Sequence, residues 1–409
     1  MTAEAATTEA TLPRVGPWPA ILAGLIASLV GYGSSFVIVL QGLVGVGATP
    51  GEAASGLLAV GTAMGLAAIV FALRYRMPIA IAWSTPGAAL LAATGPVAGG
   101  FPAAVGAFLV AGALVVLAGL WKPLGRAVLA IPAPIANAML AGVLLEFCLA
   151  PFKAIAEVPA LALPVIVVWA VFARFARLYA APAAVAAAIV MFVLSLSGLV
   201  PGAGGAAAAA TASAGLWPHL DWIMPVFTGP AIVSIALPLF LVTMASQNIP
   251  GFAVLRSNGY EPPPTPLLVG TGIASIAAAP FGGHAVNLSA ITAAICAGRD
   301  AHPDPSRRYI AAVSSGIAYV VMGVLAPVAV GFISASPPIL IEAVAGLALL
   351  GAFGSALVGA VTGPQDREAA AITFLVTASG LSFFGISGAF WGLVAGGAML
   401  AWTRWRRPA

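Results

Sequence analysis

The chain has 409 residues, of which 61% are hydrophobic and only 7% are charged; because a soluble domain carries about 25% charged residues, a soluble or disordered protein is excluded. The net charge of +4 comes from basic residues scattered singly and in pairs, which gives no reason to expect a nucleic-acid partner. Long continuous apolar runs, unlike the alternating segments of about ten residues in β-barrels, predict an all-α polytopic membrane protein.

The first segment, residues 1–17, contains Glu4 and Glu9 and lacks the apolar core of a signal peptide, so we expect a disordered cytoplasmic tail. A membrane span needs about 20 apolar residues, and the remaining sequence contains fourteen segments that approach this length. The fourteen expected spans are 18–43, 51–73, 78–95, 101–121, 130–150, 159–175, 180–200, 228–255, 265–281, 284–298, 309–332, 337–361, 369–384 and 386–403.

The distribution of basic residues orients these spans, because cytoplasmic loops carry an excess of Lys and Arg. With the N-terminus in the cytoplasm and the spans alternating in direction, Lys153 is the only basic residue that falls on the outside. An error of one span would invert all later loops and remove this asymmetry. The pattern therefore predicts an even number of spans with both termini in the cytoplasm.

The longest connection, the Ala- and Gly-rich segment 201–227, is expected to be an external linker. It divides the chain into a first seven-span repeat, 18–200, and a second, 228–405. Because seven is odd, two such repeats in tandem have opposite orientations in the membrane, which is the inverted-repeat architecture of transporters. A weak internal echo supports the repeat: Pro134 and Pro338 are each followed, after six residues, by Ala-Gly.

Spans three and ten are interrupted at corresponding places in the two repeats. In span three, Thr85 is a good N-cap and Pro86 suits the first helical position, so a half-helix is expected to start there. In span ten, Gly282 and Gly283 disfavour helix, and a helical run begins at Ser289.

The inverted repeats would point these two half-helix N-termini at each other near the bilayer midplane. Free N–H groups and the helix dipoles would then bind an anion without a cationic side chain. Such a site suits this chain, because no Lys or Arg is expected deep within a span. The alternative interpretation is that the two breaks are packing kinks.

Several segments resemble the benzoate/proton symporter (BenE) family, and the resemblance covers about residues 15–405. The segments that carry it are 82–87 (AWSTPG), 246–251 (SQNIPG), 282–289 (GGHAVNLS), and Pro337-Pro338 with 345–348 (AGLA). The resemblance implies the fold of uracil permeases and sulfate/bicarbonate transporters within the APC superfamily, with fourteen spans in a 7+7 inverted repeat. It also implies a core domain of spans 1–4 and 8–11 and a gate domain of spans 5–7 and 12–14, with the substrate between them.

The activity implied by the resemblance is import of benzoate or a similar aromatic carboxylate by proton symport. The implied location is the bacterial inner (plasma) membrane, and a homodimer through the gate domain is left open. The nucleobase branch of this fold group carries acidic residues on spans eight and ten, where this chain has Gln247 and Asn248, and Asn287 and Ser289. A carboxylate there would repel an anion, whereas amides and hydroxyls would not. The alternatives are a transporter of another small anion or of a nucleobase and, less favoured, an anion channel.

The expected substrate site combines residues of the two breaks with residues of spans one and eight. The expected substrate-binding residues are Ser84, Thr85, Pro86, Gln247, Asn248, Asn287, Leu288, Ser289 and Tyr32. His284 is the first candidate for proton coupling because histidine titrates near neutral pH, with a structural role as its alternative. Glu146 is the second, since ionisable groups inside spans are costly and often functional; snorkelling to the membrane interface is its alternative.

An enzyme is not expected from this sequence. The three histidines, His219, His284 and His302, lie far apart, and no metal-binding motif or catalytic acidic pair accompanies them. No metal or cofactor is therefore expected, and the expected partners are the substrate, protons and the lipid bilayer.

Overall fold

The computed structural model describes residues 16–121, 123–124, 132–200, 217–362, 366–384 and 386–405. Most of the expected tail, and residues 201–216 of the expected linker, lie outside this part of the chain. The helices and strands are α1 (Trp18–Gly33), α2 (Phe36–Gly45), α3 (Pro50–Tyr75), β1 (Ile81–Trp83), α4 (Thr85–Thr94), α5 (Gly100–Leu120), α7 (Ala133–Glu157), α8 (Pro159–Phe175), α9 (Ala180–Leu196), α11 (Gly229–Ala231), α12 (Leu237–Thr243), α13 (Ile249–Ser257), α14 (Pro264–Ala278), β2 (Val286–Leu288), α15 (Ala290–Ala297), α16 (Tyr309–Val324), α17 (Ala326–Ala335), α18 (Pro338–Val361), α19 (Arg367–Ala378) and α20 (Gly388–Trp405).

The fold is mostly helical, as in a polytopic membrane protein. Within the described residues, eight helices are long and apolar enough to cross a membrane. A bent pair, Pro305–Val324 and Ala326–Ala335, with 54° between its two helices, would make a ninth. The other expected spans, numbers three, six, ten, thirteen and fourteen, contain shorter helices, and those of spans six and fourteen, Pro159–Phe175 and Gly388–Thr403, are apolar. The fourteen-span repeat therefore stays a prediction.

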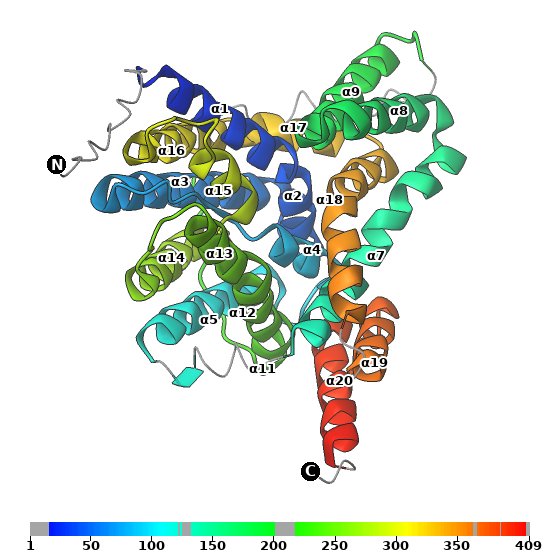
Figure 1. Ribbon diagram of the computed structural model, residues 1–409. Helices are drawn as coiled ribbons and strands as arrows, with labels where there is room; N and C mark the ends of the chain where they lie inside the picture. Colours follow the sequence, from blue (N-terminus) through cyan, green and yellow to red (C-terminus); the bar gives the residue numbers. More distant parts are fainter. Residues whose placement is uncertain are drawn as a thin grey trace, which may run out of the picture.

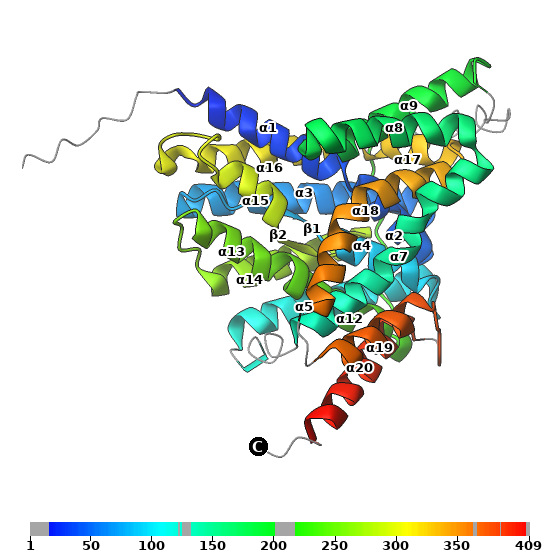
Figure 2. The same ribbon diagram turned by 45° about the vertical axis from the view of Figure 1, so that its right-hand side comes forward.

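The helices form two groups, which can be followed in Figures 1 and 2. One group contains α1–α5 and α11–α16, with β1 and β2 in its interior; the other contains α7–α9 and α18–α20. In the first group α16 packs against α1 and α3, and in the second α7 packs along α18. The groups meet where α2 and α4 contact α18 and α7.

Small residues let these helices approach closely, as is common between membrane helices. Where α3 crosses α16, a Cβ atom added to Gly316 would lie 2.6 Å from the carbonyl oxygen of Gly65. Where α7 crosses α18, a Cβ atom at Gly346 would overlap the carbonyl group of Phe147. Such backbone contacts account for glycine in helices, where its propensity is low.

One expectation was wrong: the protein is not all-α, because β1 and β2 form a two-stranded antiparallel sheet. The pairing continues past the strand ends, where the Ser84 N–H donates to the Ala285 carbonyl (2.9 Å) and the Ser289 N–H donates to the Ala80 carbonyl (3.0 Å). Extended backbone in an apolar interior must satisfy its N–H and C=O groups within the protein. Each interrupted segment therefore uses the other as its partner.

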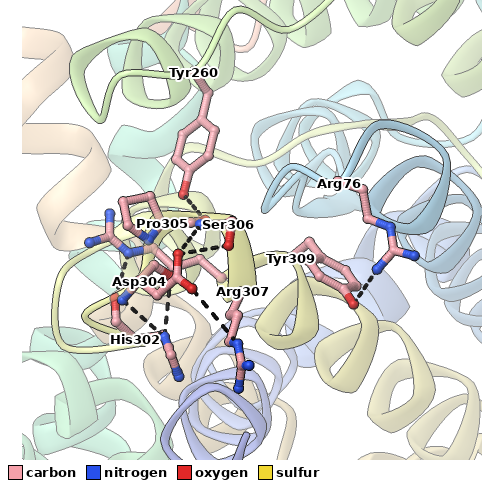
Figure 3. A network of polar contacts seen from close by, with 9 residues as sticks. Arg76, Tyr260, His302, Asp304, Pro305, Ser306, Arg307 and Tyr309 are labelled. Atoms are coloured by element: carbon pink, nitrogen blue, oxygen red, sulfur yellow. Dashed lines mark hydrogen bonds and ion pairs between the residues drawn. The ribbon is translucent and has the colours of Figure 1, made fainter. Parts of the chain in front are cut away.

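A polar network closes the connection between α15 and α16 (Figure 3). Arg308 is buried, and it donates to the carbonyl oxygens of His302 (2.7 Å) and Ala297 (2.9 Å). Since α15 ends at Ala297, the guanidinium satisfies a terminal carbonyl and places positive charge at the negative end of the helix dipole. Tyr260, in the α13–α14 connection, donates to the carbonyl oxygen of Pro305 (2.8 Å) and holds this connection against the network.

The hydrogen bonds of Asp304 in this network predict that the stability of the folded protein depends on pH. Its carboxylate accepts hydrogen bonds from the Ser306 hydroxyl (2.7 Å) and amide (2.9 Å), which lower the pKa of Asp304. A pKa lowered by folding stabilises the protein above the unfolded pKa, and this contribution is lost as the pH falls through the folded pKa. Asp304→Ala should therefore melt at a lower temperature than the parent at neutral pH, with the difference closing in strongly acidic buffer. Melting curves of both purified proteins check this, and a pH-independent difference would contradict it.

Candidate functional site

Both interrupted segments begin a short helix with a serine cap. At the start of α4, the Ser84 hydroxyl accepts from the Gly87 N–H (3.1 Å). At the start of α15, the Ser289 hydroxyl accepts from the Thr292 N–H (3.4 Å). The expected cap of α4 was wrong by one residue: Thr85 is already helical, because the Ser84 hydroxyl is the one that reaches an N–H three residues further on.

The first turns of α4 and α15 border one small cavity of about 50 Å³. Three of the expected substrate-binding residues, Thr85, Gln247 and Ser289, line it. Ligand pockets usually measure about 300–1,000 Å³, so in this conformation the cavity has room for water only. The structure therefore brings both half-helix N-termini to one small site.

The wall of the cavity combines polar and apolar residues and carries no charge. Within the described residues, no ionisable Asp, Glu, His, Lys or Arg side chain lines it. Its electrostatic character comes from the N-termini of α4 and α15, whose first N–H groups have no intrahelical partner and carry partial positive charge. Trp83, Met64 and Ile291 add apolar surface. Such an arrangement can hold a small anion that has an apolar body.

An aromatic pair supports one wall of the cavity. Trp83 donates from Nε1 to the Ser35 hydroxyl (2.8 Å), which in turn donates to the carbonyl oxygen of Gly31 (2.7 Å). Tyr32 packs against Trp83, with ring centroids 4.9 Å apart, and its hydroxyl donates to the carbonyl oxygen of Met322 (3.0 Å). Tyr32 thus supports Trp83 from behind and does not line the small cavity.

Gln247 and Asn248 lie in a π-helical turn, Met244–Asn248, before α13. The physical cause is Pro250, which has no N–H for the carbonyl four residues earlier and whose ring crowds that carbonyl. The widened turn directs the two amides to different places. Gln247 lines the cavity, whereas the Asn248 side-chain oxygen accepts from the Leu288 N–H (3.0 Å) and holds β2.

Three other expected residues support the cavity without lining it. Asn287 is fully buried, and with its amide oriented to satisfy both groups its oxygen accepts from the Ser84 N–H (3.0 Å). Leu288 is buried in β2 and packs against α13, where a Cβ atom added to Gly251 would lie 2.7 Å from it. Pro86 is buried in the first turn of α4. These residues fix the position of both half-helices.

His284 is fully buried beside the cap of α4. Its Nε2 lies 3.2 Å from the carbonyl oxygen of Ser84, and because a carbonyl only accepts, this nitrogen carries the hydrogen. Nδ1 is then a proton acceptor, and it has no hydrogen-bond partner within the described residues. The ring therefore holds a free basic nitrogen next to one half-helix N-terminus, although it does not line the small cavity.

Glu146 lies in a different place. It borders a second cavity, of about 460 Å³, between α2, α7, α17 and α18, together with Gln41 and Glu342. This larger cavity shares no lining residue with the small one. The two candidates for proton coupling are therefore not brought together.

The sequence analysis missed several residues of the small cavity. Thr292 and Tyr319 contribute hydroxyl groups from α15 and α16, and Met64 contributes an apolar wall from α3. Thr292 could have been found, because it follows the Ser289 cap by one helical turn. Tyr319 and Met64 lie within uninterrupted apolar helices, where no local pattern separates a cavity residue from a packing residue.

Helices that can cross a membrane, two interrupted segments paired through their strands, and an uncharged cavity between two helix N-termini are typical of a membrane transport protein. Within the described residues, no group of three or more His, Cys, Asp or Glu side chains could hold a metal ion.

The chain belongs to the BenE family, described as benzoate membrane transport protein, which it matches over residues 16–402. It is 41% identical over 382 residues to inner membrane protein YdcO of Escherichia coli (strain K12), covering 93% of this chain and 95% of that protein. It is 33% identical over 398 residues to the benzoate membrane transport protein of Acinetobacter baylyi (strain ATCC 33305 / BD413 / ADP1), covering 97% of this chain and 98% of that one.

The fold is also similar to that of two solved transport proteins. The transmembrane domain of the cyanobacterial bicarbonate transporter BicA superposes with a TM-score of 0.54 at 14% identity, over 94% of this chain and 96% of that one. SLC26A9 superposes with a TM-score of 0.60 at 13% identity, over 95% of this chain and 65% of that one. At these identities the likeness concerns the fold alone, which is SLC26-like.

Proposed function

We propose that this chain imports benzoate or a similar aromatic carboxylate together with a proton, by alternating access around the small cavity. The observation that carries the proposal is the pair of serine-capped half-helices, α4 and α15, whose first turns border one cavity without ionised lining side chains. The family description and the 33% identity to a benzoate membrane transport protein support the substrate class.

In this proposal the carboxylate sits between the N-termini of α4 and α15. Thr85, Gln247 and Ser289 offer hydrogen bonds from the cavity wall, and the aromatic ring lies against Trp83 and Ile291. Amide, hydroxyl and backbone N–H groups stabilise an anion without a fixed cationic side chain. The site is thereby suited to release its substrate as well as to bind it.

A cavity of about 50 Å³ does not hold a benzene ring, which an apolar cavity of about 150 Å³ accommodates. Binding therefore requires a larger cavity. All lining residues of the small cavity belong to the group of α1–α5 and α11–α16, and we propose that the cavity enlarges as this group shifts against the group of α7–α9 and α18–α20. We assign these groups, in this order, to the core and gate domains that the sequence resemblance implies. Their relative movement would open the site to one side of the membrane at a time.

We assign the coupled proton to His284, with Glu146 as the second candidate. Protonation of Nδ1 places a positive charge beside the cap of α4, and the hydrogen-bond partner of this ring in the described residues is a carbonyl, not a carboxylate. The bound anion then serves as the counter-ion of the imidazolium, so proton and substrate bind more tightly together than apart. Symport requires this mutual dependence.

The proposal keeps the finer expectations from the sequence. They are fourteen spans in a 7+7 inverted repeat with spans three and ten broken, both termini in the cytoplasm, and a place in the APC superfamily. We propose the bacterial inner membrane as the location, in agreement with the name of YdcO, and a homodimer through the gate domain as the assembly.

Ser213→Cys tests the proposed orientation. This position lies outside the described residues, in the linker expected on the external side. The two native cysteines, Cys148 and Cys296, are buried, so an impermeant thiol reagent should label only the introduced cysteine. Labelling is expected in intact cells, with the unsubstituted protein as the control. Exclusive labelling in everted vesicles would reverse the orientation.

Transport is tested with labelled benzoate in proteoliposomes that have an acidic exterior. Uncharged benzoic acid crosses lipid on its own, so protein-free liposomes set the baseline. Accumulation above this baseline should require the pH gradient, and benzoate should be displaced by unlabelled benzoate but not by uracil or sulfate. Proton entry should depend on substrate; proton flux without substrate would indicate a channel, and failure to exceed the baseline would contradict benzoate transport.

A further inference from the structure

The small cavity has a polar feature that the binding of plain benzoate does not use. Thr292 and Tyr319 line the cavity, and Ser315 lies beside the Tyr319 hydroxyl, one turn earlier in α16. Each of these three side chains is 1% exposed. The hydroxyls of Thr292 and Ser315 interact with the hydroxyl of Tyr319, and within the described residues no group outside these three gives any of them a hydrogen bond. We call these three residues the hydroxyl cluster.

Unpartnered hydroxyls are unfavourable in a buried place, because the hydrogen bonds that water gave them are lost. Neighbouring hydroxyls can partly satisfy one another, but these three hold more donors and acceptors than they can pair among themselves, so a ligand or solvent at the cavity can supply the rest. The backbone of α1 blocks the other side of the cluster: a Cβ atom added to Gly31 would overlap the Tyr319 hydroxyl and lie 3.0 Å from Cγ2 of Thr292. A further partner would therefore reach Thr292 or Tyr319 from the cavity, which both of them line.

The position of the hydroxyl cluster relates it to the proposed anion site. Thr292 follows the Ser289 cap by three residues, which is about 5 Å along the helix axis. The carboxylate is placed at the cap, so the cluster lies about one helical turn from it. A substituent on the aromatic ring of the same substrate can span this separation.

We propose that the hydroxyl cluster binds a hydroxyl substituent on the ring, so that the preferred substrates are hydroxybenzoates. This inference rests on the proposed function, since it requires the carboxylate at the half-helix N-termini. A ring hydroxyl both donates and accepts hydrogen bonds, as do the hydroxyls of Thr292, Ser315 and Tyr319. Plain benzoate would add no partner to the cluster, and a buried site with polar groups that are only partly paired discriminates against the ligand that cannot pair with them.

The first experiment measures equilibrium binding of benzoate, the three positional isomers of hydroxybenzoate and the three methylbenzoates to the purified wild-type protein. At least one hydroxybenzoate should bind about tenfold more tightly than benzoate, as one added hydrogen bond allows. The methylbenzoate with its substituent at the same place should show no such gain, because a methyl group fills similar space without pairing. Water that permanently satisfies the cluster would give no preference, and benzoate binding as tightly as every hydroxybenzoate would overturn the inference.

The second experiment removes the cluster. Tyr319→Phe and Thr292→Val each delete a hydroxyl with little change in shape, and each should reduce the preference for hydroxybenzoate from about tenfold to about twofold or less. The readout is the ratio of the two affinities, so benzoate affinity is measured on the same protein as the reference. Tyr75→Phe, at the end of α3 and away from the cavity, is the matched control and should keep the preference. If Tyr319→Phe fails to fold, Thr292→Val decides alone; an unchanged preference in the folded variants overturns the inference.

The outcomes separate this inference from the function on which it rests. Wild-type protein that binds and accumulates benzoate, yet shows no preference for a ring hydroxyl, contradicts only the role of the hydroxyl cluster. Protein that binds neither benzoate nor any hydroxybenzoate contradicts the proposed function itself.

Discussion

Gln247→Glu should weaken benzoate binding by about 100-fold. The side chain lines the small cavity between the N-termini of α4 and α15, so the new carboxylate would face the substrate carboxylate. Two like charges about 6 Å apart, at an effective dielectric constant of about 20, repel by about 3 kcal/mol, which corresponds to about 100-fold in affinity. Equilibrium binding of labelled benzoate to the purified variant measures the effect.

A matched control is available in the larger cavity. Gln41→Glu makes the same chemical change outside the small cavity, where Gln41 lies beside Glu146 and Glu342. It should reduce benzoate affinity by less than about tenfold, because physiological salt screens charges that lie further apart. Melting curves confirm that both variants are folded. If folded Gln247→Glu protein binds benzoate like the parent, the carboxylate does not bind between the two half-helices.

His284→Gln should bind benzoate and yet lose the accumulation that a pH gradient drives. In the parent, a proton on Nδ1 attracts the anion, so benzoate affinity should rise as the pH falls, and the bound anion should in turn favour the proton. Glutamine keeps a donor for the Ser84 carbonyl but has no basic nitrogen. The variant should therefore show a benzoate affinity that is independent of pH, and uptake in proteoliposomes no greater than the passive baseline.

His302→Gln is the control for the His284 variant, because His302 is also buried but lies in the connection between α15 and α16. It should retain the pH-driven accumulation. Normal accumulation in His284→Gln protein would remove the proton role from His284. Glu146 would then be the remaining candidate, and Glu146→Gln would test it in the same assay.

Local chemistry explains which parts of the site could be predicted from the sequence. Gly282 and Gly283 disfavour helix, and serine is a good N-cap residue in any sequence. The start of α15 after Ser289 can therefore be predicted from neighbouring residues alone. Thr85 and Ser84 are both good caps, and the choice between them depends on which hydroxyl reaches the Gly87 amide. The sequence does not determine this detail of backbone geometry. The cap of α4 was therefore predicted one residue too late.

Pairing between distant segments could not be predicted in this way. Nothing near Ala82 specifies Asn287 as its partner in the sheet, because strand pairing depends on how two halves of the chain come together. The same holds for Asn248, whose amide was expected at the substrate but binds the backbone of β2 at Leu288. Tyr319 shows the reverse error: nothing in its apolar helix indicates that it reaches the cavity.

The number of membrane crossings shows a different limit. Apolar composition and the basic loops predict fourteen spans, but α4 has 10 residues and α15 has 8. An unaided helix of 10 residues rises only about 15 Å, half the thickness of the hydrocarbon core. If the chain crosses the membrane at these places, each crossing would consist of an extended segment and a helix in series, which hydropathy cannot distinguish from a single interrupted helix.

The β1–β2 ladder has a mechanical consequence for substrate passage. Separating α4 from α15 would break the backbone hydrogen bonds at Ser84 and Ser289 in an apolar interior, where no water replaces them. The two helix ends consequently stay at a fixed spacing while the anion is carried. In the proposed mechanism the contacts to the carboxylate would then be the same at loading and at unloading, and only the position of the proposed gate domain would change. The proposed core domain would carry the substrate as a rigid body. The energy barrier to transport would then be set by the sliding of this domain against the gate domain.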